Sequence, residues 1–306
     1  MSSSRKSRIA SSMSNVMFTN AVYFPNYRIY QGDTPGMLNY SCINHVYYSY
    51  ASVSVDGGVF LSDEWADAGA PVDGVQGGLG SLMHLKQKHP HLRVVLSIGG
   101  GNSSEIFPLV ASSTLLRDNF ARSAKGLVEA SGLDGIDIAW EYPCDVQQGY
   151  DFLALLAAVR IHLPEEHYVL TAALPAAKSI LQFLDLMEIA EYLDFINLMA
   201  YDFFGSWTPK AGHHAQLYAM DKEETSASSG VSYLMSKGFP LRRFCLVFQL
   251  LDEASFTAQE QDTNTRALVV RKMARLSTIN SHARGAKRLS TNAMLQHTAR
   301  GQMADL

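Results

Sequence analysis

Two acidic residues, Asp137 and Glu141, lie in the string DGIDIAWEYP at residues 134–143 and are of a type that performs acid–base chemistry. Alternate side chains of a β-strand share a face, so Asp137, Ala139 and Glu141 point to one side and Asp134 to the other. A carboxyl group held among apolar or aromatic side chains has a raised pKa and can act as a general acid. Two interpretations stay open here: catalytic acids, or acids that satisfy backbone groups at a strand end.

The elements that must position these acids follow from the hydrophobic pattern of residues 17–240. Short apolar, β-branched runs predict six buried strands, and stripes at a spacing of three to four residues predict helices between them. The strands are expected at 19–24, 43–51, 92–98, 133–139, 167–173 and 193–199, and helices at 113–130, 149–163 and 183–191.

Repeated strand–helix units predict an α/β fold with a parallel sheet. A doubly wound sheet and a (β/α)8 barrel both fit this pattern. No GxGxxG follows the first strand and no GxxxxGK[ST] occurs anywhere, so the glycine patterns do not support a nucleotide-binding fold. Polar residues gather where the strands end, as on the active face of a barrel. They are Tyr23, Tyr50, Ser97, Asp137, Glu141, Tyr201 and Asp202.

Composition excludes several other classes of protein. The 306 residues are 47% hydrophobic and 18% charged, which is typical of a globular chain. No run of 18 apolar residues occurs, and the pI of about 6.2 argues against general nucleic-acid binding. The three cysteines are far apart, so we expect neither a zinc site nor a disulfide framework.

The first residues bear on localisation. Residues 1–16 contain basic residues and serines but no apolar core of a secretory signal peptide. We therefore expect a short disordered arm on a cytoplasmic protein, with a mitochondrial targeting segment as the weaker alternative. If the start of the gene is mispredicted, an extracellular location follows instead.

Several segments resemble, in order, the motifs of glycoside hydrolase family 18, the chitinase family. DGIDIAWEYP resembles the family signature DGxDxDWEYP, and MAYDFFGSW at 199–207 resembles its MxYD motif. SIGG at 97–100 resembles its SxGG motif, and TAALPA at 171–176 fits its fifth strand. VYFPNYRIY at 22–30 resembles the first strand of fungal class V chitinases.

This resemblance, over about residues 17–240, implies a (β/α)8 barrel that hydrolyses β-1,4-linked N-acetylglucosamine polymers with retention. The resemblance implies that no metal or organic cofactor is needed. It also implies that chitin or chito-oligosaccharides are the partners. We expect a monomer without nucleic-acid or membrane partners.

The resemblance also implies roles for individual residues in a substrate-assisted mechanism. Glu141 protonates the glycosidic oxygen, and Tyr201 donates a hydrogen bond to the acetamido oxygen of the substrate. Asp137, supported by Ser97, lies behind a middle carboxylate. The residues expected to bind or support the sugar are Tyr23, Ser97, Trp140, Tyr142, Met199 and Asp202, although Trp140 and Tyr142 fit packing roles as readily.

Two positions depart from the family pattern inside the resembling region. Ala139 stands where the family has the middle Asp, and Ala can neither accept a hydrogen bond from the acetamido N–H nor balance positive charge. The loss of one such group typically costs about 10²–10³ in rate. Gly101 follows SIGG where many members have an aromatic residue, so one sugar platform is absent.

The remainder of the chain differs in composition. Residues 241–306 contain 10 Lys and Arg against 5 Asp and Glu, whereas residues 1–240 contain 15 against 24 and all the Tyr and Trp. The family's seventh strand, its GPG-containing insertion and its final Trp-bearing strand are not visible there. One explanation is a genuine basic interaction tail.

The other explanation, which we favour, is an out-of-frame translation from about residue 242. Codons built from the last base of one codon and the first two of the next can encode GIPAxGRSF over 246–255 and GGEEDGTFEY over 268–278. Both strings resemble parts of the family's missing C-terminal third. A looser match, AVDERDVAAYSSGADGGF, can be encoded over 288–306.

These observations divide the chain into three parts: an arm at 1–16, barrel strands one to six at 17–240, and an aberrant basic tail at 241–306. Strands seven and eight are then lost or replaced by the tail. A barrel without them would have two open edges and an exposed core.

Three alternatives to a chitinase stay open. Ala139 favours a lectin-like protein that binds chito-oligosaccharides without cleaving them, whereas Glu141, Asp137 and Tyr201 favour an enzyme lineage. An endo-β-N-acetylglucosaminidase acting on N-glycans fits less well, because residues 22–30 and 199–207 are of fungal class V type. A degraded gene product without a folded function is the third alternative.

The frame hypothesis predicts a specific nucleotide sequence. Sequencing the transcript from codon 130 to the stop should show shifted codons that encode the family's C-terminal strands after about codon 241. A nucleotide sequence across codons 235–306 that fits no shifted reading would leave the genuine basic tail as the explanation.

Overall fold

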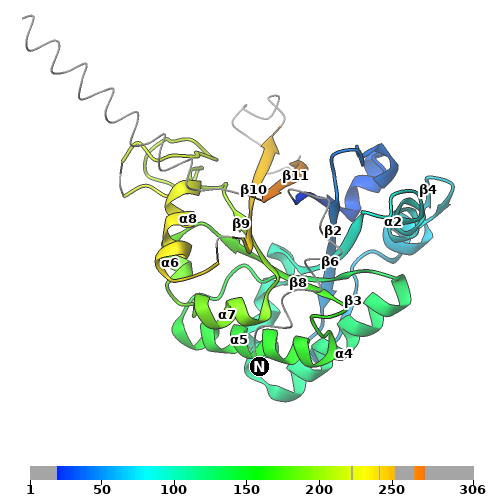
Figure 1. The fold of residues 1–306 in the computed structure, drawn as a ribbon, viewed down its shortest axis with the longest axis horizontal. Helices are drawn as coiled ribbons and strands as arrows, with labels where there is room; N and C mark the ends of the chain where they lie inside the picture. Colours follow the sequence, from blue (N-terminus) through cyan, green and yellow to red (C-terminus); the bar gives the residue numbers. More distant parts are fainter. Residues whose placement is uncertain (1–18, 222, 241, 252–264, 273–306) are drawn as a thin grey trace, which may run out of the picture. The chain divides into compact units, whose positions relative to one another are not determined.

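The main sheet closes on itself. Its strands pair in the order β1-β11-β10-β9-β8-β7-β6-β2-β3, and β1 also pairs with β2. The computed structural model describes residues 19–221, 223–240, 242–251 and 265–272, which lie in one compact unit (Figure 1). The arm expected at 1–16 and the tail residues 252–264 and 273–306 lie outside the described residues.

The strands of the ring are β1 (Asn20–Pro25), β2 (His45–Val53), β6 (Arg93–Gly99), β7 (Gly135–Ala139), β8 (Val169–Pro175), β9 (Phe195–Met199), β10 (Phe244–Leu251) and β11 (Thr265–Lys272). Strand β3 (Val59–Leu61) extends β2, and β4 (Pro71–Val72) pairs with β5 (Val75–Gln76) in a separate hairpin. The helices are α2 (Gly77–Lys88), α3 (Phe107–Ser112), α4 (Thr114–Ser131), α5 (Val146–His162), α6 (Lys178–Leu181), α7 (Leu186–Tyr192) and α8 (Ala227–Ser236). Short 3₁₀ helices lie at Asn26–Gln31, Pro35–Met37 and Gly101–Ile106, and a short π-helix lies at Trp65–Gly69.

The prediction of a barrel is confirmed, and each of the six expected strands is present within two residues of its expected bounds. Strands β1, β2, β6, β7, β8 and β9 are parallel to one another, so their carboxyl ends meet at one rim. Helices α4, α5 and α7 correspond to the three predicted helices, whereas α2, α3, α6 and α8 were not predicted.

Residues of the tail replace strands seven and eight. Strand β10 pairs in parallel with β9, with Leu246 opposite Leu198. Strand β11 then runs antiparallel to both β10 and β1, with Val270 opposite Val247 and Ala21. The two edges that were expected to be open are therefore paired, although the closing strand has the opposite direction to that of a regular (β/α)8 barrel. The shifted-frame origin of these residues stays a prediction.

Local sequence signals fix the ends of the helices. Asp145 caps α5 by accepting a hydrogen bond from the Gln148 amide, and Ser113 caps α4 in the same way. Gly132 ends α4 in the left-handed conformation that glycine adopts readily, with φ of 70°.

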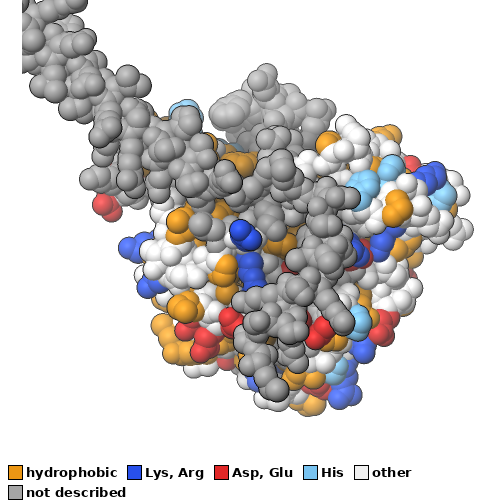
Figure 2. Space-filling model, in the orientation of Figure 1, with side chains coloured by type: hydrophobic (Ala, Val, Ile, Leu, Met, Phe, Trp, Pro, Cys, Tyr) orange, Lys and Arg blue, Asp and Glu red, His pale blue; other side chains and the backbone are white. Residues whose placement is uncertain are grey.

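Charged side chains of both signs lie on the outer surface of the described residues (Figure 2). No helix in the described part of the chain has the length and apolar content needed to cross a bilayer.

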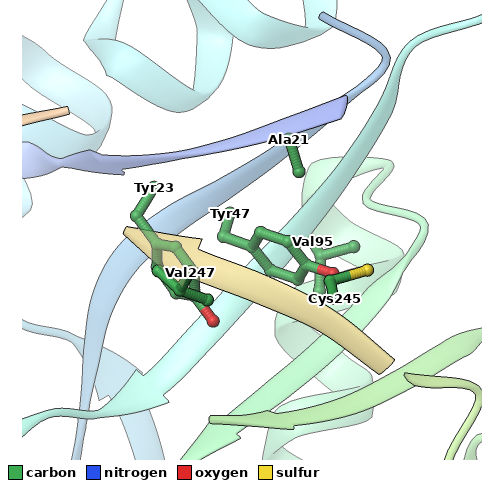
Figure 3. Close-up of a cluster of buried hydrophobic side chains, with 6 residues drawn as sticks. All are labelled: Ala21, Tyr23, Tyr47, Val95, Cys245 and Val247. Carbon is green, nitrogen blue, oxygen red and sulfur yellow. The ribbon is translucent and has the colours of Figure 1, made fainter. Parts of the chain in front are cut away.

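The interior of the ring holds side chains from strands on opposite sides of the barrel. Tyr23, Tyr47, Val95 and Cys245, from β1, β2, β6 and β10, pack together with Ala21 and Val247 (Figure 3). The rings of Tyr23 and Tyr47 stack with centroids 4.7 Å apart. These two tyrosines bring hydroxyl groups into the interior.

Trp140 lies on the other side of the sheet, so its expected role as a sugar contact is wrong. Its ring stacks on that of Phe107 of α3, with ring centroids 5.6 Å apart, and meets that of Phe152 of α5 edge-on, with ring centroids 6.1 Å apart. Only 2% of the surface of Trp140 is exposed. The cause is strand alternation: Asp137 and Ala139 face the barrel interior, so the intervening residues and Trp140 face the helices.

Removal of the Trp140 ring should destabilise the whole protein. A buried Trp→Ala change typically costs about 3–5 kcal/mol through lost burial and a residual cavity. We expect Trp140→Ala to show this loss in urea unfolding, whereas Trp207→Ala, at a residue 65% exposed, should change stability by less than about 0.5 kcal/mol. Equal effects of the two substitutions would contradict the placement of Trp140 in the core.

Candidate active site

The buried carboxylate of Asp137 accepts four hydrogen bonds inside the barrel. Tyr23 and Ser97 donate to its Oδ2 atom at 3.0 and 2.7 Å. Thr171 and Asn197 donate to its Oδ1 atom at 2.6 and 3.2 Å. We call these five residues the Asp137 network. Burial raises the pKa of Asp137, and the four donors oppose that shift by stabilising the charged form.

Strand register assembles this network. Ser97 of β6 and Thr171 of β8 are the direct partners of Asp137 on the two neighbouring strands. Asn197 comes from β9 and also donates to the Tyr23 hydroxyl at 2.9 Å, while Tyr23 itself comes from β1. Asp137 has no exposed surface, and its four hydrogen-bond donors all lie inside the barrel.

The structure has Ser97 donating to Asp137, as expected, but differs from the expectation for Tyr23 and adds two more residues. Tyr23 is buried and donates to the Asp137 carboxylate, so its hydroxyl lies inside the barrel instead of lining the sugar site. Thr171 and Asn197 were missed by the sequence analysis. Their signal was a polar side chain at an inward position of an otherwise apolar strand, where burial requires a hydrogen-bonding partner.

Glu141 lies just beyond the end of β7, at the rim. Burial raises the pKa of its carboxyl group, and the negative charge of Asp202 raises it further. None of the described residues donates a hydrogen bond to this carboxyl group. A glutamic acid in such a setting keeps its proton to higher pH than usual and can deliver it to a leaving group.

Asp202 and Tyr201 follow β9 and lie near Glu141. Asp202 has a φ of 57°, and its Oδ1 atom is 3.2 Å from Nδ1 of His214. Burial raises the pKa of Asp202, and His214 partly opposes that shift. Burial also raises the pKa of the Tyr201 hydroxyl, next to Tyr50 and Tyr142, so this hydroxyl remains a hydrogen-bond donor at ordinary pH.

Ala139 occupies the interior position between Asp137 and Glu141. Its methyl group packs with Ala173 and Met199, and Tyr50, Tyr142 and Tyr201 pack against this small cluster. The structure therefore brings together Glu141, Tyr142, Met199, Tyr201 and Asp202 around the position where the signature has its middle carboxylate. The space holds apolar atoms and tyrosine rings in place of a charge.

Two glycines allow the strand end of β6 to approach β7. A Cβ atom on Gly99 would lie 2.3 Å from the Ala139 carbonyl oxygen, and one on Gly100 would lie 3.0 Å from the Tyr50 ring. Only residues without a side chain fit here, with φ of 119° and 75°.

In the described ranges, no group of three or more His, Cys, Asp or Glu side chains could hold a metal ion.

Comparison with known proteins gives a consistent family. The model of "Glycosyl hydrolases family 18" matches residues 19–299. Chitinase 1 of Aphanocladium album is 41% identical over 220 residues, which cover 66% of this chain and 52% of that protein. Endochitinase 1 of Metarhizium robertsii is 40% identical with the same coverage. The chain thus spans about half the length of these relatives.

Solved structures agree on the fold. The chitinase ChiA74 from Bacillus thuringiensis superposes with a TM-score of 0.67 at 26% identity, over 74% of this chain and 47% of that chain. The family match extends beyond residue 240 and therefore includes most of the tail, whose assignment as a separate part stays a prediction.

Replacement of Asp202 should lower the pKa of Glu141. Without the neighbouring negative charge, the ionised form of Glu141 is less unfavourable, so an NMR titration of 13C-labelled Glu141 should shift to lower pH in Asp202→Asn. Glu165→Gln, at an exposed residue beside the start of β8, should leave the titration unchanged. An unchanged or raised pKa in Asp202→Asn would contradict the electrostatic coupling.

Proposed function

Because the chain belongs to glycosyl hydrolases family 18, we propose that it binds β-1,4-linked N-acetylglucosamine polymers and hydrolyses them slowly. The observation on which this rests is the rim group of Glu141, Tyr201 and Asp202 around an uncharged position 139. The first two supply an acid and a hydrogen-bond donor, and Ala139 withholds a charge that the reaction uses.

The reaction we propose is substrate-assisted. Glu141 gives its proton to the glycosidic oxygen as the bond from that oxygen to the anomeric carbon breaks. The carbonyl oxygen of the substrate's own 2-acetamido group attacks the anomeric carbon and forms an oxazolinium ion. Water then opens this ion, with the Glu141 carboxylate accepting the proton of the water, so the configuration is retained.

Tyr201 would donate a hydrogen bond to the acetamido oxygen. Asp202 and Met199 would contact the sugar, with Tyr142 beside them. Ala139 can neither accept a hydrogen bond from the acetamido N–H nor balance the positive charge that develops on the oxazolinium ring. The absence of a carboxylate at this position should cost about 10²–10³ in rate, the typical effect of one well-placed electrostatic group.

A lectin-like function is the alternative that Ala139 favours. The remaining contacts would then hold a chito-oligosaccharide without cleavage. Binding and turnover therefore have to be measured separately.

The substitution Ala139→Asp tests the proposal. We expect it to raise kcat for chito-oligosaccharide hydrolysis by about 10²–10³, because it supplies the missing charge. Ala139→Asn, of similar size but uncharged, should give a much smaller gain, and Ala139→Asp combined with Glu141→Gln should remove the activity. Chito-oligosaccharide binding without turnover in the Ala139→Asp variant would support the lectin-like function, and no binding by any variant would exclude both.

A further inference from the structure

The turn at Gly101–Ile106, between β6 and α3, is bonded directly to the backbone of the proposed acid. The Glu141 amide donates a hydrogen bond to the Ser104 hydroxyl oxygen at 2.7 Å. The Ser104 hydroxyl in turn donates to the Gly100 carbonyl oxygen at 3.0 Å. A third bond, from the Gly100 amide to the Ala139 carbonyl at 2.8 Å, joins the same two segments. The ends of β6 and β7 are thereby tied together through one side chain.

The Ser104 hydroxyl makes both of its hydrogen bonds within the protein. Its single proton goes to Gly100 and it accepts the Glu141 amide, and only 7% of the residue is exposed. The amide of Glu141 lies beyond the last residue of β7, where no neighbouring strand offers a carbonyl partner in the ladder. Ser104 supplies that missing partner.

A second contact from the next residues fixes the orientation of this segment. Phe107, directly after the turn, stacks on Trp140 with the two rings 9° from parallel. With the Trp140 side chain held among the helices, the side chain of Glu141 must leave on the opposite side. The turn also flanks the acid: a Cβ atom built on Gly101 would lie 3.8 Å from Oε2 of Glu141.

We propose that Ser104 is a positioning residue, which fixes the backbone of Glu141 and so aims its carboxyl group at the glycosidic oxygen. Glu141 has no hydrogen-bonded partner for its carboxyl group among the described residues, so its direction depends on the backbone that bears it. This inference rests on the proposed function for its effect on catalysis. The bond between Ser104 and Glu141 does not depend on that function.

Kinetics in the Ala139→Asp background give the first test. Ser104→Ala should lower kcat by about tenfold to a hundredfold, the cost of a misplaced catalytic group, with KM changed less than about twofold. Ser103→Ala is the matched control, because Ser103 is an equally buried neighbour whose hydrogen bond to Gly100 uses its backbone amide. Ser104→Thr, which keeps the hydroxyl, should recover most of kcat. Equal kcat values for Ser104→Ala and Ser103→Ala would overturn the proposal.

NMR measurements on variants that keep Ala139 give a second test that needs no turnover. In Ser104→Ala, the Glu141 amide should exchange its hydrogen faster and the titration of the Glu141 carboxyl group should shift, and neither should change in Ser103→Ala. Faster exchange with an unchanged titration would overturn the positioning role, as would unchanged exchange. If no variant hydrolyses or binds chito-oligosaccharides but these changes are seen, the proposed function fails and the structural inference stands.

Discussion

A carboxyl group buried at the centre of the barrel, that of Asp137, is the constraint on which the rest of this structure depends. An ionised carboxyl group in the protein interior costs several kcal/mol unless hydrogen bonds replace the lost water. Asp137 meets this requirement with donors from four other strands, β1, β6, β8 and β9. All five strands must therefore keep one register, because a slip by a single residue would turn each donor away from the interior.

The position of Asp137 also determines what surrounds it along β7. Residue 139 must face the interior two positions further on, where the strand reaches the rim, and residue 140 must face the helices. Trp140 accordingly anchors β7 to α3 and α5, while Glu141 emerges beside the ends of the other strands. The same alternation thus gives the protein a structural core on one side and a candidate reaction site on the other.

Loss of the middle carboxylate changes the site without disturbing this framework. Ala139 is buried in a small apolar cluster, and the donors of Asp137 are satisfied without it. The fold therefore has no need of a charge at position 139, whereas the proposed substrate-assisted reaction does. Stability and the proposed reaction thus make different demands on this residue.

The six buried strands and the family could be predicted from the sequence, because strand periodicity and motif spacing are local properties. The roles of Thr171 and Asn197 came from the three-dimensional arrangement: Thr171 lies opposite Asp137 on the neighbouring strand, and Asn197 reaches Asp137 from β9 inside the barrel. The tertiary structure also decided that Trp140 belongs to the core, and that β10 and β11 pair with β9 and β1. Neighbour identity across a closed sheet depends on register and closure, and no local pattern along one strand encodes them.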